Sequence, residues 1–253
     1  MGADVTDRVV IITGGSRGIG RAAALAAAAR GYRIVVGYAS NEAAAKEVVA
    51  NIEAKNGKAI AVQCDVGKES DILRLFEAAD KFGTLGALVN NAGIVGKSGV
   101  RVDEMSAERI PEMMAVTVTG SILCAREAVK RMSTRHGGKG GVIVNISSVA
   151  AKLGAANTYV DYAASKGAID TFTLGLGLEV AGEGIRVAGI RPGLIDTEIH
   201  AAGGEPDRAH RLAPMVPMKR VGQAEEIANA IVWLMSDDAS YVTSTTIDVS
   251  GGR

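Results

Sequence analysis

Cysteine and aromatic residues are both scarce in this chain. Its two cysteines, Cys64 and Cys124, lie far apart in the sequence and form neither a CxxC pair nor a metal-ligand spacing with histidine. A disulfide framework and a metal site are therefore not expected. We expect the protein to be found in a reducing compartment. Aromatic residues make up 4% of the chain and hydrophobic residues 47%. We expect an aliphatic core, as is typical where helices pack closely on a parallel sheet.

An excess of charge of either sign is also missing, because 28 Lys and Arg residues balance 28 Asp and Glu residues. Without a basic tract, neither a nucleic-acid surface nor a polybasic membrane patch is expected. The sequence has no uncharged apolar run of about 18 residues, the length that suggests a membrane-spanning helix. The N-terminus lacks the basic-then-apolar layout of a secretion signal. We expect a cytoplasmic protein.

Short apolar segments rich in β-formers alternate along the chain with Ala-rich or amphipathic stretches. Strict alternation predicts parallel pairing with right-handed crossovers, and therefore an α/β fold of three layers around a doubly wound seven-stranded parallel sheet. No linker or repeat divides the chain, so residues 1–253 are expected to form a single domain. The expected strands are 9–13, 33–38, 59–64, 87–91, 141–147, 186–191 and 245–249, and the expected helices are 18–30, 41–56, 70–82, 106–136, 158–182 and 224–236.

Residues 193–223 form one long irregular stretch with prolines at 206, 214 and 217. The stretch follows the sixth expected strand, so it emerges at the carboxyl edge of the sheet, where ligands bind in open α/β folds. We expect it to be a substrate lid. The alternative is a surface excursion without a role.

The motif Thr13-Gly14-Gly15-Ser16-Arg17-Gly18-Ile19-Gly20 lies directly after the first expected strand and opens a helix. Its glycines 14, 18 and 20 leave no Cβ in the way, so backbone amides and the positive helix end can approach a pyrophosphate. The motif predicts a dinucleotide site, and the alternative is a tight structural bend.

The end of the second expected strand indicates which dinucleotide binds. A carboxylate there would hydrogen-bond the ribose 2′-hydroxyl of NAD and repel the 2′-phosphate of NADP. Residues 36–41 contain no acid, whereas Arg17, with Ser40 and Asn41 as neutral donors, suits a 2′-phosphate. NADP is therefore expected, with NAD as the alternative.

The segment Tyr162-Ala163-Ala164-Ser165-Lys166 follows a strand that ends in Ser147 and Ser148. Residues four apart share one face of a helix, so Lys166 can lie near the Tyr162 phenol. A free tyrosine has a pKa of about 10, and a nearby cation and a positive nicotinamide ring both favour its phenolate. The pattern predicts that Tyr162 is a general acid or base. By itself, such a pair is common on solvated helix surfaces.

Together these motifs resemble those of the short-chain dehydrogenase/reductase family, over essentially the whole chain. The resemblance implies a Rossmann fold and hydride transfer between a nicotinamide cofactor and a carbonyl or alcohol carbon of a small substrate. It also implies a homotetramer, with the helices at 106–136 and 158–182 as contact surfaces. The matching pieces are residues 13–20, Asp65, Asn90 to Gly93, Asn145 to Ser148, Tyr162 with Lys166, and Pro192-Gly193 with Thr197.

The resemblance implies a role for each matching residue. Ser148 binds the substrate oxygen, Tyr162 exchanges the proton, and Lys166 supports Tyr162 and binds the nicotinamide ribose. The motifs and the resemblance together give the expected cofactor-binding residues, which are Gly14, Ser16, Arg17, Gly18, Ile19, Gly20, Tyr38, Ser40, Asp65, Val66, Asn91, Ala92, Gly93, Tyr162, Lys166, Pro192, Gly193, Ile195 and Thr197.

One residue departs from the family pattern. Thr117 stands where members often carry an asparagine that holds a water in the proton relay, and a threonine there can still hydrogen-bond that water. Thr117 is also the only support for an alternative hypothesis, a catalytically idle, cofactor-binding regulatory or scaffold protein.

Other polar residues have plainer interpretations. Asn90 and Asn145 are expected to fix the sheet, and Asp161 to be a surface or interface charge. His136, His200 and His210 lack metal-ligand spacing, although His200 lies in the expected lid and can reach substrate. The closest resemblance is to bacterial 3-oxoacyl-carrier-protein reductases and glucose 1-dehydrogenases. A carrier protein would need a basic patch, which Arg101, Arg126, Arg131 and Arg135 provide only if they converge.

Overall fold

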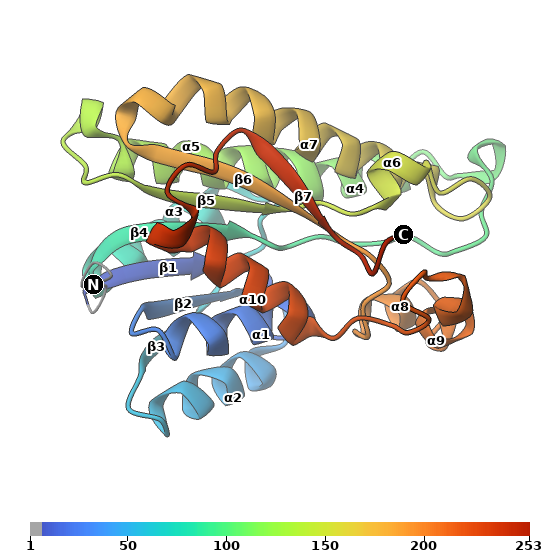
Figure 1. Cartoon of the computed structure of the whole chain (residues 1–253), viewed down its shortest axis with the longest axis horizontal. Helices are drawn as coiled ribbons and strands as arrows, with labels where there is room; N and C mark the ends of the chain where they lie inside the picture. Colours follow the sequence, from blue (N-terminus) through green and yellow to red (C-terminus); the bar gives the residue numbers. More distant parts are fainter. Residues whose placement is uncertain (1–6) are drawn as a thin grey trace.

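The computed structural model describes residues 7–253. Its seven strands are β1 (Arg8–Ile12), β2 (Arg33–Tyr38), β3 (Lys58–Gln63), β4 (Thr84–Asn90), β5 (Gly141–Ile146), β6 (Ile185–Pro192) and β7 (Thr245–Val249). They form one parallel sheet in the order β3-β2-β1-β4-β5-β6-β7 (Figure 1). The predicted seven-stranded, doubly wound α/β fold is confirmed.

Helices cover both faces of this sheet and complete the three expected layers (Figure 1). On one face lie α1 (Gly18–Ala28), α2 (Glu42–Glu53) and α10 (Ala224–Met235), and on the other α3 (Glu69–Phe82), α5 (Gly120–Met132) and α7 (Val160–Val180). The shorter helices are α4 (Arg109–Met114), α6 (Ala150–Leu153), α8 (Ile199–Ala202) and α9 (Arg208–Leu212).

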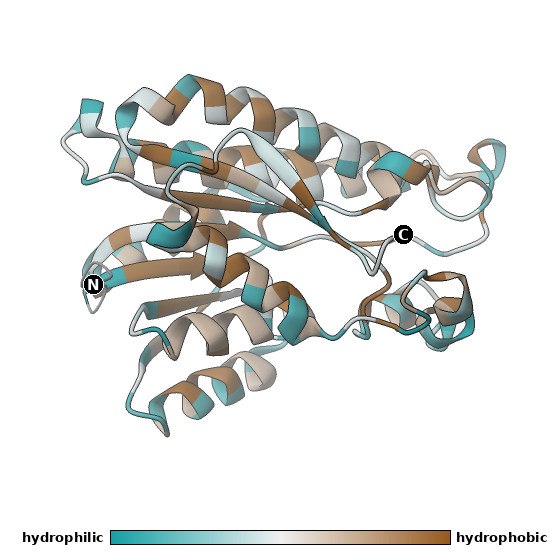
Figure 2. Ribbon diagram, in the orientation of Figure 1, coloured by the Kyte–Doolittle hydropathy of each residue, from teal (hydrophilic) through white to brown (hydrophobic). Residues whose placement is uncertain are grey.

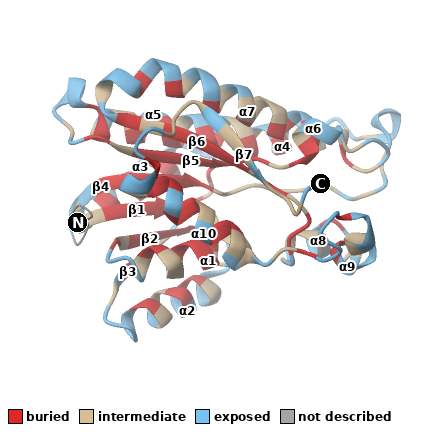
Figure 3. Cartoon of the chain, viewed as in Figure 1, coloured by how far each residue is buried: buried red, intermediate tan, exposed pale blue. Residues whose placement is uncertain are grey.

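The two faces of the sheet bury separate aliphatic clusters. Val10 and Ile12 of β1 pack in the cluster with α1, α2 and α10, whereas Val9 and Ile11 pack in the cluster with α3, α5 and α7. Because successive side chains of a strand point to opposite faces, a strand covered on both sides needs apolar residues throughout. The inner strands β1, β2, β4, β5 and β6 are accordingly hydrophobic in Figure 2 and buried in Figure 3, whereas the edge strands β3 and β7 are partly exposed.

The helix expected over residues 106–136 is interrupted. It is divided into α4 and α5 by a π-helical turn at Ala115–Thr119, and it ends with a separate 3₁₀ turn at Thr134–His136. A π turn adds one residue to a helical turn and is often found at functional sites. The apolar pattern of the sequence does not register a single added residue, which is why the prediction missed it.

Strands β1 and β4 are parallel neighbours in the sheet. The order of the strands reverses between them, with β2 and β3 on one side and β5, β6 and β7 on the other. In doubly wound sheets, the crevice at such a switch point lies at the carboxyl ends of the strands and is the usual ligand site. In Figure 1 these ends point toward α8 and α9 of the segment 193–223, and the C-terminal residues lie beside that segment.

Both cysteines are buried and unpaired. Within residues 7–253, no group of three or more His, Cys, Asp or Glu side chains is placed to hold a metal ion. In the same part of the chain no helix has the length and apolar character needed to cross a membrane.

Candidate active site

A cleft of about 930 Å³ opens at the carboxyl ends of the strands. Most of the residues predicted to form the site line it, and they come from segments far apart in the sequence. They are Gly14, Ser16, Arg17, Gly18, Ile19, Ser40, Asp65, Val66, Asn91, Ala92, Gly93, Ser148, Tyr162, Lys166, Pro192, Gly193, Ile195 and Thr197. Of the other predicted residues, Gly20, Tyr38 and Thr117 lie outside the lining.

The glycine turn between β1 and α1 needs glycine for two reasons. Gly14 and Gly18 have φ of +62° and +49°, a region that side chains disfavour. Gly20 contributes by packing instead, because a Cβ there would collide with the carbonyl oxygen of Gly14 and the amide of Asn91. The turn therefore brings bare backbone and the N-terminus of α1 to the cleft wall.

Thr13 and Asn91 join the ends of β1 and β4 at the switch point. The Thr13 hydroxyl oxygen accepts hydrogen bonds from the amides of Asn91 (3.1 Å) and Ala92 (3.0 Å). The Asn91 side-chain amide in turn donates to the carbonyls of Thr13 (2.9 Å) and Gly14 (3.0 Å). These bonds fix the shape of the glycine turn from the neighbouring strand.

The residues that follow β2, Ala39, Ser40 and Asn41, line the cleft, and none of them is acidic. The exposed Arg17 lies in the same lining, and its side chain makes no hydrogen bond or ion pair with the described residues. The Asn41 side chain caps α2 by accepting from the amide of Ala44 (3.0 Å). Tyr38 is 8% exposed and packs in the core with α1 and α2 instead of lining the cleft.

Tyr162 and Lys166 lie one turn apart on α7 and both face the cleft. The Lys166 Nζ is 5.6 Å from the centroid of the Tyr162 ring and donates a hydrogen bond to the carbonyl of Ile146 (2.7 Å). Ser148, just beyond β5, lines the cleft beside them. The Ser147 hydroxyl donates instead to the backbone carbonyl of Lys166 (3.1 Å), so it ties β5 to α7.

Burial dominates the titration of this pair. It raises the pKa of Tyr162 to about 12, and a hydrogen bond with Ser148 opposes the rise. It lowers the pKa of Lys166 to about 8, and the Asp170 carboxylate opposes the fall. This rise is opposite in direction to the lowering of the Tyr162 pKa that the sequence predicted from a neighbouring cation and a positive nicotinamide ring. At neutral pH Tyr162 is a protonated phenol and Lys166 is mostly an ammonium.

A family model described as enoyl-(acyl carrier protein) reductase matches residues 14–253. The chain is 54% identical over 246 residues to the uncharacterized oxidoreductase YgfF of Escherichia coli (strain K12), covering 97% of this chain and 99% of that protein. The chain belongs to the short-chain dehydrogenase/reductase family.

Other relatives are named for dehydrogenase chemistry or a bound dinucleotide. Glucose 1-dehydrogenase 2 of Bacillus subtilis (strain 168) is 39% identical over 250 residues, which cover 98% of this chain and 95% of that protein. Blue fluorescent protein from a metagenomic library, solved in complex with NADPH, superimposes with a TM-score of 0.89 at 30% identity and 99% coverage of each chain. The predicted Rossmann fold and the prediction of an oxidoreductase of this family are confirmed.

A buried amide and hydroxyl network supports the catalytic strands of this dehydrogenase/reductase. Asn90 donates to Asn145 (2.9 Å) and to the carbonyl of Ser121 (3.1 Å), and Asn145 donates to the Thr173 hydroxyl (2.9 Å). These bonds connect β4, β5, α5 and α7 beneath the cleft. Asn90 and Asn145 therefore fix the sheet, as predicted.

Asp161 was expected to be a surface or interface charge, and it is not an exposed surface charge. Its side chain is 6% exposed and forms a two-pronged ion pair with Arg109, whose Nε and Nη2 lie 2.7 and 3.0 Å from the carboxylate oxygens. Arg109 also donates to the carbonyl of Lys97 (2.9 Å). The pair joins the start of α7, next to Tyr162, to α4 and to the loop after β4. The surface interpretation is wrong because the sequence does not show this partner.

Thr117 lies in the π-helical turn and is 1% exposed. Its hydroxyl faces the sulfur of Met113, 3.8 Å away, and its backbone carbonyl accepts from the Ser121 hydroxyl (2.8 Å). The Thr117 side chain does not line the cleft. Its role in a proton relay stays a prediction.

The four arginines considered for a carrier protein do not form an unpaired basic patch. Each has a carboxylate partner: Arg101 with Asp103, Arg126 with Glu69 and Glu127, Arg131 with Asp80 and Glu127, and Arg135 with Glu183. His200 lines the cleft, as expected for a residue that can reach substrate, and its Nε2 lies 3.0 Å from the carbonyl of Ile195.

Proposed function

We propose that this protein catalyses hydride transfer between NADP(H) and a carbonyl or alcohol carbon of a small substrate, with Tyr162 as the proton donor or acceptor. The observation that carries the proposal is that Ser148, Tyr162 and Lys166 face the same cleft as the glycine turn of β1 and α1. Relatives named as a glucose dehydrogenase and as an NADPH-bound protein support it.

The described residues fit a phosphorylated dinucleotide. The glycine turn offers backbone amides and the N-terminus of α1 to a pyrophosphate, and a helix N-terminus favours bound anions. Among residues 7–253, the Arg17 side chain has no hydrogen-bond or ion-pair partner. It lines the same cleft as Ser40, which follows β2, and residues 36–41 contain no acid to oppose a 2′-phosphate. When bound, the cofactor would donate or accept the hydride at its nicotinamide ring. Asp65, Asn91, Gly93, Ile195 and Thr197 line the rest of its proposed site.

The chain's own residues handle the substrate oxygen and its proton. Ser148 and Tyr162 hydrogen-bond the carbonyl oxygen, which orients it and stabilises the charge that develops on it. During reduction the Tyr162 hydroxyl gives its proton to this oxygen, and during oxidation it takes the proton back. The Lys166 ammonium lowers the energy of the phenolate that remains. It is held in place by its bond to the carbonyl of Ile146.

Cofactor choice is tested by titrating NADPH and NADH against the protein and its Arg17→Ala variant. A charge-assisted hydrogen bond contributes about 1.5–3 kcal/mol, so we expect NADPH to bind about 10- to 100-fold more weakly to the variant. The affinity for NADH should change little, because NADH lacks the 2′-phosphate. Arg21→Ala removes the same charge from α1 outside the cleft and serves as the control. Equal losses for both cofactors would overturn the assignment of Arg17 to the 2′-phosphate.

Catalysis is tested by a turnover screen of small ketones, acyl thioesters and sugars with the preferred cofactor. Turnover of any of them supports the proposal. Binding of the cofactor without turnover over the whole screen would favour the alternative, a catalytically idle regulatory or scaffold protein.

The pH dependence of reduction follows from Lys166. Its pKa is lowered to about 8 by burial, so the ammonium that stabilises the developing phenolate is lost as the pH rises through about 8. We expect kcat/KM for reduction, which reports on the free enzyme, to fall above that pH. Asp170 raises the pKa of Lys166, so Asp170→Asn should move the fall to lower pH. Initial-rate assays across the pH range measure the kcat/KM profile of the wild-type protein and of Asp170→Asn. A profile that stays flat well above pH 8 would contradict the role of Lys166.

The remaining assignments also stay proposals. The chain is proposed to be one catalytic domain located in the cytoplasm, with residues 193–223 as its substrate lid. The homotetramer is supported by exposed apolar side chains on the two long helices, Ile122 on α5 and Leu174 and Leu178 on α7.

A further inference from the structure

Two arginines lie at the end of the cleft beside Tyr162, and the function proposed above gives neither a role. Arg208 on α9 and Arg253 both line the cleft. The guanidinium carbon of Arg208 is 5.1 Å from the centroid of the Tyr159 ring, and that ring meets the Tyr162 ring edge-on with centroids 5.4 Å apart. Arg208 is thus separated from the proposed proton donor by one aromatic ring.

Arg253 reaches the same place. Burial raises the pKa of Tyr159, and the charges of Arg208 and Arg253 both oppose that rise. Both guanidinium groups therefore line the same cleft as Tyr159, and both charges act on its phenol. In Figure 1 the C-terminal residues lie beside the segment that carries α8 and α9, which agrees with this meeting of two distant parts of the chain.

Neither guanidinium group is satisfied by the residues from 7 to 253. Arg208 makes its ring contact but no side-chain hydrogen bond or ion pair, and the buried Nη1 of Arg253 has no hydrogen-bond partner. The other arginines of the lid are paired, Arg211 with Glu205 and Arg220 with Glu226. A buried donor without a partner is costly, so an unpaired guanidinium in a cleft indicates a ligand that completes it.

One acid of the cleft, Glu205, interacts electrostatically with Arg208 and with Tyr159. A hydrogen bond with Ser98 and the charges of Arg211 and Arg208 lower the pKa of Glu205, and its carboxylate is paired with Arg211. Glu198 lies against Gly18, at the glycine-turn end of the cleft. Around Tyr159, the two guanidinium charges of Arg208 and Arg253 are opposed by the one carboxylate of Glu205, so positive charge is in excess.

We propose that Arg208 and Arg253 bind an anionic group of the substrate, so that the enzyme acts on oxo and hydroxy compounds that carry a carboxylate or phosphoryl group. The inference rests on the function proposed above and adds the substrate class. A guanidinium group presents donors in a planar fork that matches the oxygens of either anion. The cleft that holds Tyr162 and the arginines is also lined by Ile94, Val95, Leu153 and Ile199, which suits a substrate with an apolar body joining the carbonyl carbon to the anion.

The test compares matched substrates in the full-length protein with NADPH. The pairs are a medium-chain oxo acid with its methyl ester, and a phosphorylated sugar with its parent sugar. We expect kcat/KM for one charged member to exceed that of its neutral partner by at least about tenfold, as a charge-assisted contact implies. Which pair shows the preference distinguishes carboxylate from phosphoryl recognition.

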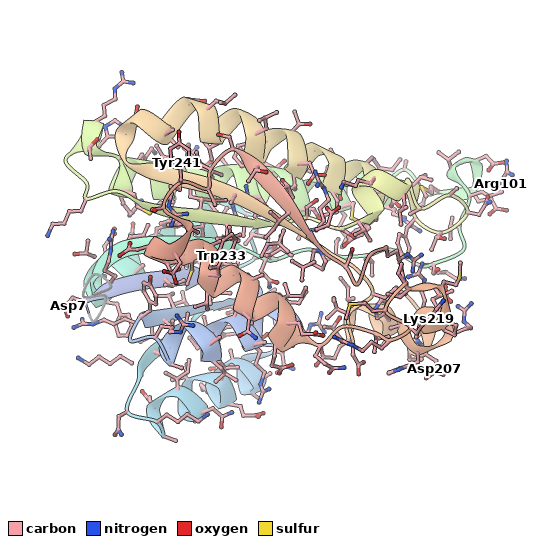
Figure 4. The ribbon with its side chains drawn as sticks, viewed as in Figure 1. Asp7, Arg101, Asp207, Lys219, Trp233 and Tyr241 are labelled. Carbon is pink, nitrogen blue, oxygen red and sulfur yellow. The ribbon has the colours of Figure 1, made fainter. Side chains whose placement is uncertain are left out.

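The variants Arg208→Gln and Arg253→Gln keep much of the side-chain length and remove the charge. Each variant should raise KM for the charged substrate about 10- to 100-fold and change its kcat little. The kcat/KM for the neutral substrate should change little, and the affinity for NADPH should stay the same. Lys219→Gln removes one charge from the same lid segment outside the cleft and is the matched control (Figure 4). Calorimetric titration of the charged compounds into the NADPH-loaded protein reads the same site without turnover.

The outcomes separate the two proposals. Turnover of neutral substrates with no preference for the charged partners overturns the anion site and leaves the proposed function standing. Weaker NADPH binding in the variants also overturns it, because the arginines would then serve the cofactor. If no substrate turns over, the proposed function fails, while binding of a charged compound that depends on Arg208 and Arg253 still supports the anion site.

Discussion

Replacing Tyr162 by phenylalanine is expected to lower kcat about 10²- to 10⁴-fold, the range that a positioned general acid supplies. The substitution removes only the hydroxyl that gives the proton to the substrate oxygen, and the ring remains packed against Tyr159. Since the loss falls on the transition state, kcat and kcat/KM should fall together. Steady-state oxidation of NADPH with the best substrate of the screen measures both.

Tyr32→Phe is the matched control. Tyr32 is a buried tyrosine in the cluster with α1 and α2, and burial raises its pKa as it does that of Tyr162, but it does not line the cleft. It should keep nearly full activity. NADPH binding, measured by fluorescence titration, should survive Tyr162→Phe within about threefold, because the phenol is not needed to hold the dinucleotide phosphates. Unchanged kcat in Tyr162→Phe would remove Tyr162 from the proton transfer.

The parts of this protein that the sequence predicted are those set by short-range constraints. A parallel strand buried on both faces needs a run of apolar residues, so Val9 to Ile12 is identified without any partner. The glycine turn is identified because its φ values and its close approach to α1 exclude side chains locally. Tyr162 and Lys166 are four residues apart on one helix, so their spacing alone puts them together.

The parts that were missed depend on contacts between distant segments. Arg109 and Asp161 are separated by 52 residues, and no periodicity connects them. Arg253 reaches the cleft only because β7 returns the chain to the sheet next to β6. Tyr38 was expected at the cofactor because it ends β2, but its side chain points to the face of the sheet covered by α1 and α2 and is buried there. The contact between Tyr159 and Tyr162 could have been predicted from the sequence, since Tyr159 precedes Tyr162 by about one helical turn.

The Arg109–Asp161 pair is expected to contribute more to stability than any exposed ion pair of the chain. Their side chains are 13% and 6% exposed, and the guanidinium lies so close to Gly96 that a Cβ there would collide with it. Breaking a buried pair by removing one partner leaves an uncompensated charge and costs about 3–5 kcal/mol. We therefore expect Arg109→Met and Asp161→Asn each to lower the free energy of unfolding, with the larger loss in Arg109→Met, which leaves the carboxylate buried and alone.

Urea unfolding at one fixed protein concentration measures these losses, since subunit association would otherwise change the apparent stability. The double variant Arg109→Met/Asp161→Asn should lose clearly less than the sum of the two single losses, because neither charge then remains unpaired. Arg101→Met breaks the exposed pair with Asp103, seen at the tip of its loop in Figure 4, and should cost about 1 kcal/mol or less. Additive losses in the double variant would mean that the two residues act independently.

The same pair links stability to catalysis, because Asp161 directly precedes Tyr162 and Arg109 holds the loop that brings Ile94, Val95 and Ser98 to the cleft. A variant that stays folded but has lost the pair should raise KM more than it lowers kcat, since the loop contacts the substrate space and the phenol itself is untouched. The KM-against-kcat comparison, made at a temperature where unfolding is negligible, distinguishes this positioning role from a loss of folded protein, which would lower the apparent kcat alone.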